Sequence, residues 1–217
     1  MFTSCKSKPK IDNEAAIQLI VKGLNLPIAK YGLFKSGDYQ TGESYKDDGN
    51  IENPDAFIRR LGKPGEIYLR NNGYRGISVR IEKTYIGPNN YGLPEYINEG
   101  PMVINFWFTE LVEPFLDSNS KKVDNNDATL TKLRTTEISF GNLTSLRQLN
   151  ENEYEVEFFL NVVNTPFGLA IKQQGAWTES GKFYDENEFQ TLKVKIVRYE
   201  NGWNIATEDL ARLRGRL

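Results

Sequence analysis

The sequence contains no histidine and only one cysteine among its 217 residues. Without histidine, the chain has no Ser-His-Asp or Cys-His couple and no side chain that titrates near neutral pH at its ordinary pKa. A single cysteine excludes an intramolecular disulfide and a cysteine-built metal site. We therefore expect no cofactor and no metal, and any catalysis has to use carboxylates, lysine, tyrosine or backbone groups.

A strong net charge and long apolar runs are also missing. The 27 basic and 29 acidic residues give a formal net charge of −2, so the chain has no global field that attracts nucleic acid or anionic lipid. No apolar run approaches the roughly 20 residues of a membrane-spanning helix. The 39% of hydrophobic residues are nevertheless sufficient for a sizeable core. We predict a globular protein that binds no nucleic acid and meets a membrane only through a lipid anchor.

The only cysteine, Cys5, follows Phe2-Thr3-Ser4, and these four residues resemble the end of a bacterial lipoprotein signal. The resemblance implies a lipid on Cys5 and a location at the bacterial cell envelope, at the outer membrane or facing the periplasm. Such a signal also needs a basic region and an apolar stretch of about 7–15 residues, so the resemblance implies a longer precursor. The polar stretch after Cys5 predicts a flexible tether over residues 1–11. The alternative is an inert thiol in a frayed terminus.

Three segments are predicted to be helical. Residues 12–24 carry apolar side chains at the spacing of one helix face. In residues 53–62, Asn53 is a cap and Pro54 stands at the first helical position. A short helix is also expected after residue 206, with arginines at its C-terminal end, where the helix dipole favours positive charge.

Most of the remaining chain is predicted to form strands. Residues 66–70, an Asn71-Asn72-Gly73 turn and residues 76–86 are expected to make a hairpin. The further strands expected are 102–112, 131–140, 152–163, 168–177 and 189–200, the last joined by a tight turn to 203–206. Residues 25–53 show no clear period and are expected to be an irregular connection with at most one short strand. Consecutive strands with helices at the ends predict an α+β fold with one or two curved antiparallel sheets.

The C-terminal third carries a family resemblance. The segments YEVEFFLNVV, GLAIKQQGAW and TLKVKIVRYENGWNI resemble the final strands of cystatin-like, or nuclear transport factor-like, domains. The resemblance implies long antiparallel strands that curl around a helix. The polar segment before residue 125 is the expected boundary between a domain at 12–117 and a cystatin-like domain at 125–217. One continuous domain over 12–217 is the alternative.

Aromatic residues supply the candidate ligand-binding side chains. Trp107 alternates with buried-type residues along its strand and lies among polar neighbours, whereas Tyr91 and Tyr96 lie in a long loop rich in glycine and proline. Exposed aromatic rings and such loops are typical of binding surfaces. Ordinary packing is the alternative role for each of them.

Carboxylates supply the alternative to binding. Glu153, Glu155 and Glu157 alternate with apolar residues and so share one face of a strand. Two of them, Glu155 and Glu157, have a separation suited to an acid and base acting on glycans, although alternation is also how a half-buried strand is built. We expect a non-enzymatic, envelope-anchored lipoprotein that binds a protein, a glycan or a small apolar ligand. The alternatives are a carboxylate-based glycan hydrolase and an immunity or inhibitor protein that caps a partner protein.

Overall fold

The computed structural model describes residues 10–46, 53–97, 99–117, 123–125 and 128–217. Within them the chain combines short helices with antiparallel strands, which confirms the predicted α+β class. The chain divides into two compact units. Among the described residues, unit 1 comprises 10–29, 137–163 and 184–217, and unit 2 comprises the described parts of 30–136 together with 164–183.

The described residues contain helices that are all short and strands that vary widely in length. The α-helices are α1 (Asn13–Leu24), α2 (Pro54–Arg60), α3 (Pro64–Asn71), α4 (Pro166–Lys172) and α5 (Thr207–Arg216), and the 3-10 helices are η1 (Glu110–Phe115) and η2 (Glu186–Phe189). The strands are β1 (Ile28–Lys46), β2 (Arg75–Ile81), β3 (Thr84–Pro88), β4 (Pro94–Ile97), β5 (Glu99–Phe108), β6 (Val123–Asn125), β7 (Ala128–Asn150), β8 (Glu153–Asn164), β9 (Thr178–Ser180), β10 (Leu192–Tyr199) and β11 (Gly202–Ile205). No helix in these segments is both long and apolar enough to span a membrane.

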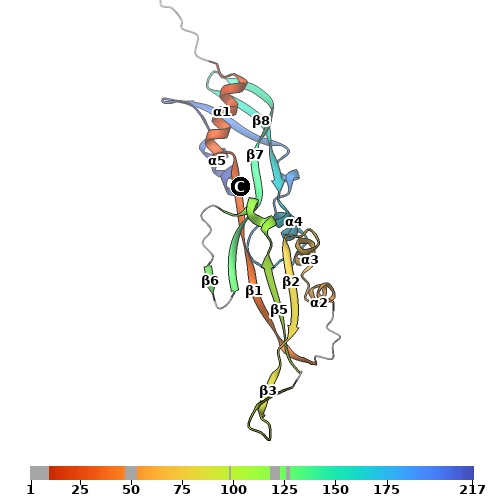
Figure 1. Cartoon of the computed structure of the whole chain (residues 1–217). Helices are drawn as coiled ribbons and strands as arrows, with labels where there is room; N and C mark the ends of the chain where they lie inside the picture. The colour runs from red at the N-terminus through yellow and green to blue at the C-terminus, as the bar shows by residue number, and fades with distance from the viewer. Residues whose placement is uncertain (1–9, 47–52, 98, 118–122, 126–127) are drawn as a thin grey trace, which may run out of the picture. The chain divides into compact units, whose positions relative to one another are not determined.

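Unit 1 is an antiparallel sheet with the strand order β11-β10-β8-β7, against which α1 and α5 pack (Figure 1). Along β8, buried residues such as Val156 and Phe158 alternate with the glutamates that the sequence places on the opposite face. The hairpin between β10 and β11 forms at the turn predicted from Asn201-Gly202, where Gly202 has a φ of 115°. The strands predicted at 152–163, 189–200 and 203–206 and the two helices predicted for this unit are therefore confirmed.

Helix α1 has clear start and stop signals. The carboxylate of Asp12 accepts a hydrogen bond from the Ala15 amide at 2.8 Å, which caps the first turn. Asn25 ends the helix in the left-handed conformation with a φ of 56°. Ile20 and Leu24 face the core of unit 1 and are almost fully buried. The apolar stripe predicted for residues 12–24 is thus the face that packs.

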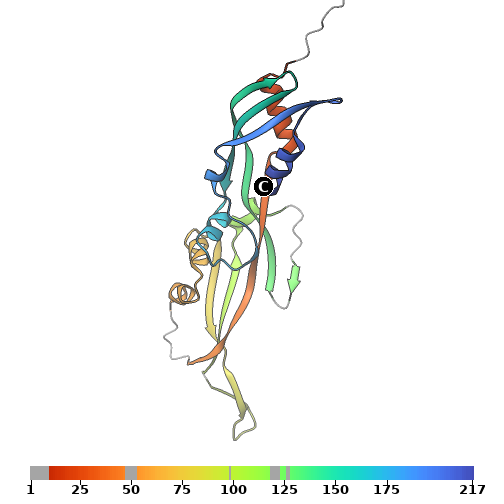
Figure 2. The same cartoon turned by 180° about the vertical axis from the view of Figure 1, so that it is seen from behind.

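Unit 2 is an antiparallel sheet with the order β7-β1-β5-β2, to which β6 and β9 add short pairings (Figures 1 and 2). Helices α2, α3 and α4 cover one face of this sheet. Ile58 and Ile67 from the first two helices pack with Ile104 and Phe106 of β5, and Phe167 of α4 packs in a neighbouring aromatic cluster. The opposite face of β2 and β5 is left without a helix among the described residues.

The prediction for residues 25–53 was wrong, because most of the described part of this segment forms the 19-residue strand β1. Its glycines and polar residues have low intrinsic strand propensity. The strand forms because it lies between β7 and β5, which supply hydrogen-bonding partners on both of its edges. Phe34, at its buried end, anchors it in the core of unit 2.

Two predicted strands are helices. Residues 66–70 lie in α3, and Gly73, with a φ of 79°, follows the end of this helix and does not form a hairpin turn. Most of residues 168–177 belong to α4 and the turn that follows it. In both cases a proline stands at the first or second helical position, where its fixed φ favours a helix start.

The division into units does not fall at the polar segment before residue 125. Strand β7 runs through the division, with residues 128–136 in unit 2 and residues 137–150 in unit 1. Each unit is assembled from segments that are far apart in the sequence, because strands paired in one sheet come from both halves of the chain.

Candidate functional site

A pocket of about 400 Å³ opens in unit 2 where β5 separates from β1. The two strands are paired as far as Gly37 and Phe106. Beyond this point Phe108 remains paired with Arg75 of β2, whereas Phe34 pairs with Thr178 of β9. The divergence of the strands leaves a space that η1 borders at one end.

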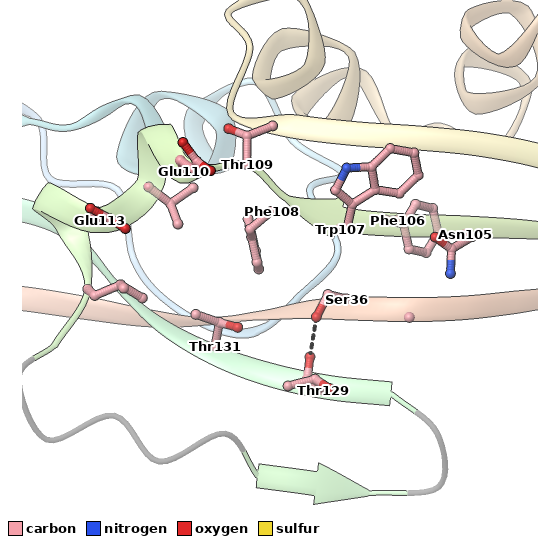
Figure 3. A pocket seen from close by; sticks show the side chains of 13 residues that line it. Ser36, Asn105, Phe106, Trp107, Phe108, Thr109, Glu110, Glu113, Thr129 and Thr131 are labelled. Atoms are coloured by element: carbon pink, nitrogen blue, oxygen red, sulfur yellow. Dashed lines mark hydrogen bonds between the residues drawn. The ribbon is translucent and has the colours of Figure 1, made fainter.

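Four elements supply the lining of this pocket, shown in Figure 3. The lining residues are Ser36 and Gly37 of β1, Asn105, Phe106, Trp107 and Phe108 of β5, Thr109, Glu110, Val112, Glu113 and Leu116 in and around η1, and Thr129 and Thr131 of β7. The set mixes aromatic rings with hydroxyls, an amide and two carboxylates. We refer to it as the Trp107 pocket.

Trp107 is held in place by a glycine on the neighbouring strand. Gly76 is its cross-strand partner. A β-carbon built on Gly76 would lie 2.0–2.3 Å from three atoms of the indole, so the ring occupies the space above that glycine. The indole therefore covers the backbone of β2 on one side, while 44% of Trp107 stays exposed to solvent. Such an arrangement fixes the ring without burying it.

Several polar groups of the pocket present hydrogen-bond acceptors. The Ser36 hydroxyl donates to the carbonyl oxygen of Thr129 at 3.1 Å, and the Thr109 hydroxyl donates to the carbonyl oxygen of Gly73 at 2.7 Å. Each hydroxyl has then used its proton and offers only lone pairs. The amide nitrogen of Asn105 donates one proton to Asp38, which leaves the second N–H as a donor and the carbonyl oxygen as an acceptor.

Two carboxylates and no cations border the pocket. Glu110 and Glu113, both on η1, are exposed at its edge (Figure 3). Among the described residues that line the pocket there is no lysine or arginine. The local charge is therefore negative, and an anionic ligand would be repelled.

A polar row continues from the pocket across the helix-free face of the sheet. Asp38 accepts hydrogen bonds from Asn105 at 2.5 Å and from Arg80 at 2.7 Å. The hydrogen bond from Asn105, followed by that from Arg80, lowers the pKa of Asp38 below its ordinary value. Asp38 is therefore ionised at neutral pH and fixes the orientation of the Asn105 side chain.

A buried ion pair supports the strand end that carries the pocket. Glu66 of α3 and Arg75 of β2 are fully buried, with 2.8 Å between Oε2 and Nε. Glu66 also accepts a hydrogen bond from the Trp177 amide, and Arg75 donates to the carbonyl oxygen of Lys35. The Arg75 guanidinium lies 4.1 Å from the centre of the Phe108 ring. This network ties α3, β1 and β2 together beneath Phe108.

Of the aromatic residues predicted from the sequence, Trp107 lines the pocket, whereas Tyr91 and Tyr96 lie elsewhere in unit 2. Both tyrosines belong to the β3–β4 hairpin, with Tyr91 89% exposed at its tip. Tyr96 pairs with Tyr85 across the hairpin, at 5.5 Å between ring centres. The structure thus gives two separate aromatic surfaces, and no hairpin residue lines the Trp107 pocket.

The glutamates of β8 lie in unit 1 and are each paired with a cation. Glu153 contacts Lys195 at 2.9 Å, Glu155 contacts Arg147 at 2.8 Å, and Glu157 pairs with Lys193. The hydrogen bond from Lys195 lowers the pKa of Glu153, which opposes a role as a proton donor. Within the described residues, no group of three potential metal ligands is close enough to hold an ion.

Several pocket residues were missed by sequence analysis. Ser36 lies in the segment that was expected to be irregular, and Thr129 and Thr131 lie next to the expected domain boundary. Glu110 and Glu113 follow β5 in η1, at the end of the segment expected to be a strand. Their three-residue spacing, which places both on one side of a short helix, is the feature of the sequence that could have pointed to them. The predicted lipidation site, Cys5, lies outside the described residues. Comparisons with protein-family models, with curated proteins and with solved structures found no match to this chain.

Proposed function

We propose that this chain is a non-enzymatic binding protein, held at the bacterial cell envelope by a lipid on Cys5, that binds its ligand in the Trp107 pocket. The observation that carries the binding function is the indole of Trp107, which is fixed over Gly76 and exposed at a pocket of about 400 Å³. Ligand pockets have volumes of about 300–1,000 Å³ and combine apolar rings with a few oriented polar groups. The volume and lining of the Trp107 pocket agree with both features.

The binding function is tested by thermal unfolding with fractionated envelope material. A fraction that holds the ligand raises the midpoint of wild type, because a ligand that binds only the folded state stabilises it. We expect a smaller shift for Trp107→Ala, because its affinity is lower, and an unchanged shift for Tyr199→Ala. Tyr199 is a matched control, since it is also 44% exposed and lies in unit 1. No shift with any fraction, or equal shifts in all three proteins, would contradict the proposal.

The envelope location is supported by the Phe2-Thr3-Ser4-Cys5 sequence alone and needs its own test. The gene, with its upstream genomic sequence, is expressed in bacteria that are fed a fatty-acid analogue. We expect label and membrane recovery for wild type and neither for Cys5→Ser. A soluble, unlabelled wild-type product would remove the envelope location and leave the binding function to stand on the pocket.

A second candidate is an immunity or inhibitor protein that binds a partner protein through the β3–β4 hairpin. The observation that favours it is the exposure of large side chains along the hairpin, among them Tyr85 and Tyr96 at 55% and Leu93 at 62%. Tyrosines are enriched among the residues that dominate protein–protein binding energy. The carboxylate hydrolase has less support, because Glu155 and Glu157 are held in ion pairs outside the pocket.

A further inference from the structure

From the chemistry of the Trp107 pocket we infer the ligand class: a saccharide without acidic groups, one ring of which stacks on the indole. This inference rests on the proposed binding function and adds the identity of what is bound. It follows from three properties of the pocket, namely its acceptors, its charge and the exposed indole of Trp107.

The acceptors of the pocket favour a ligand that carries several hydrogen-bond donors. Ser36 and Thr109 have used their hydroxyl protons on backbone carbonyl oxygens, and Asn105 has used an amide proton on Asp38. Glu110 and Glu113 add carboxylate oxygens, which accept and do not donate when ionised. A sugar ring presents several hydroxyl donors in different directions and so matches such a lining. A purely apolar ligand leaves these acceptors without partners, which is costly wherever water is excluded.

The charge of the pocket disfavours acidic ligands. Two carboxylates and no cations lie in its lining, so a carboxylate, sulfate or phosphate on the ligand meets repulsion that no arginine or lysine relieves. Two unit charges about 5 Å apart in water interact by a little under 1 kcal/mol, so two such repulsions lower the affinity of an acidic analogue about tenfold.

The indole of Trp107 supplies an apolar contact for the sugar ring. One side of Trp107 packs over Gly76, so the ring lies on the β2 side of β5 (Figure 3), and Trp107 is among the residues that line the pocket. A pyranose carries aliphatic C–H groups on one face and hydroxyls around its edge. Stacking that face on the indole removes apolar surface from water while the hydroxyls remain free to reach Asn105 and Glu110.

The test measures binding of matched oligosaccharides to the full chain by titration calorimetry. The panel contains neutral oligomers of hexose and of N-acetylhexosamine. Each has an acidic counterpart of the same length in which a uronic acid replaces one neutral sugar unit. We expect at least one neutral oligomer to bind and its acidic counterpart to bind about tenfold more weakly. In Glu110→Gln/Glu113→Gln this discrimination should shrink toward onefold, because the repelling charges are gone.

Variants at the ring separate stacking from a structural role of the indole. We expect Trp107→Phe to retain binding and Trp107→Ala to weaken it about tenfold, with the same unfolding midpoint in both. Tyr199→Ala should bind as wild type does. Tighter binding of the acidic oligomers, or equal binding by Trp107→Ala, would overturn the inference.

Different experimental results would overturn the saccharide inference and the proposed binding function. If no oligosaccharide of the panel binds, but an envelope fraction freed of saccharides still raises the unfolding midpoint of wild type more than that of Trp107→Ala, the pocket binds another ligand class and the inference is wrong. If neither the panel nor any fraction has an effect, both the inference and the binding function are wrong.

Discussion

The indole of Trp107 lies over Gly76 of the neighbouring strand, in the space that any larger residue's β-carbon would occupy. This relationship explains how a tryptophan can stand on a solvent-exposed sheet face without being mobile. Gly76 therefore affects the site through the position of the indole, although it is not among the residues that line the pocket. The pair therefore permits a change at the site that leaves every lining side chain intact.

Gly76→Ala tests this relationship. The new methyl group would lie 2.0 Å from the Cε2 atom of Trp107, so the ring has to rotate toward solvent. Because the indole is 44% exposed and can be displaced into solvent without opening a cavity in the core, we expect a stability loss of no more than about 1 kcal/mol. Ligand affinity should fall as far as in Trp107→Ala. Ser78→Ala, on the same face of β2, is the control, and equal behaviour of the two variants in binding and unfolding would contradict the role of Gly76.

Because Glu66 and Arg75 form a buried ion pair, we predict that removing one partner lowers the free energy of unfolding far more than removing both. Arg75→Met leaves an uncompensated carboxylate in the core, and we expect a loss of about 3–5 kcal/mol in urea unfolding. In Glu66→Gln/Arg75→Met the amide still accepts a hydrogen bond from the Trp177 amide, so much of the loss should be recovered. A double variant no more stable than Arg75→Met would contradict this prediction, because removing the unpaired carboxylate would then have recovered nothing.

How far sequence could predict this fold depends on which signals are local. Helix α1 was predictable because its cap at Asp12 and its apolar stripe lie within one segment. The strand alternation of β8 was predictable for the same reason. Strand β1 was not, because its stability comes from pairing with β5 and β7, which are more than 50 residues away in sequence. Local propensity does not register such partners.

The site shows the same limit more strongly. That Trp107 shares a face with polar residues followed from the period of its own strand. Its position over Gly76 depends on the register between β2 and β5, which no local pattern specifies. The approach of Ser36 and Thr129 depends in turn on the pairing of β1 with β7. Helices α3 and α4 were misassigned although Pro64 and Pro166 marked their starts, since short apolar segments fit either type of element.

Asp38 predicts a pH dependence that can be traced to one neighbour. Its pKa is lowered chiefly by the hydrogen bond from Asn105, so its contribution to stability is present above the unfolded pKa of about 4 and is lost as pH falls through the lower folded pKa. In Asn105→Ala we expect the pKa of Asp38 to rise toward its ordinary value, as measured by carboxyl chemical shifts. Gln40→Ala, which leaves both donors to Asp38 in place, should cause no rise. An unchanged titration in Asn105→Ala would contradict this assignment.

The glutamates of β8 provide a test between binding and hydrolysis. Because Glu155 and Glu157 are held in ion pairs in unit 1, Glu155→Gln/Glu157→Gln should bind the ligand of the Trp107 pocket as wild type does. Neither protein should release reducing sugar from the oligosaccharides used for binding. The mirror variant Arg147→Gln/Lys193→Gln controls for loss of the ion pairs. Turnover by wild type that disappears in the glutamate variant alone would establish the hydrolase instead.

The exposure of the apolar side chains on the β3–β4 hairpin predicts that they contact another molecule and do not stabilise the fold of this chain. Ile86, Tyr91 and Leu93 are 54%, 89% and 62% exposed, so Ile86→Ser/Tyr91→Ser/Leu93→Ser should change the free energy of unfolding by less than about 0.5 kcal/mol. Ile104→Ser, at a fully buried position of β5, is the destabilising comparison. A loss above about 1 kcal/mol in the hairpin variant would show that these side chains pack against the unit.

The same hairpin variant decides between the two candidate functions. Pro88 and Pro94, with the irregular pairing near Gly87, make strand addition at the hairpin edges unfavourable, so a partner has to be bound through side chains. If the chain binds a partner protein through this hairpin, the triple variant loses that partner in sedimentation of the purified pair and keeps the ligand of the Trp107 pocket. If it keeps both, the hairpin is not the partner surface, and the immunity or inhibitor function loses the observation that favours it.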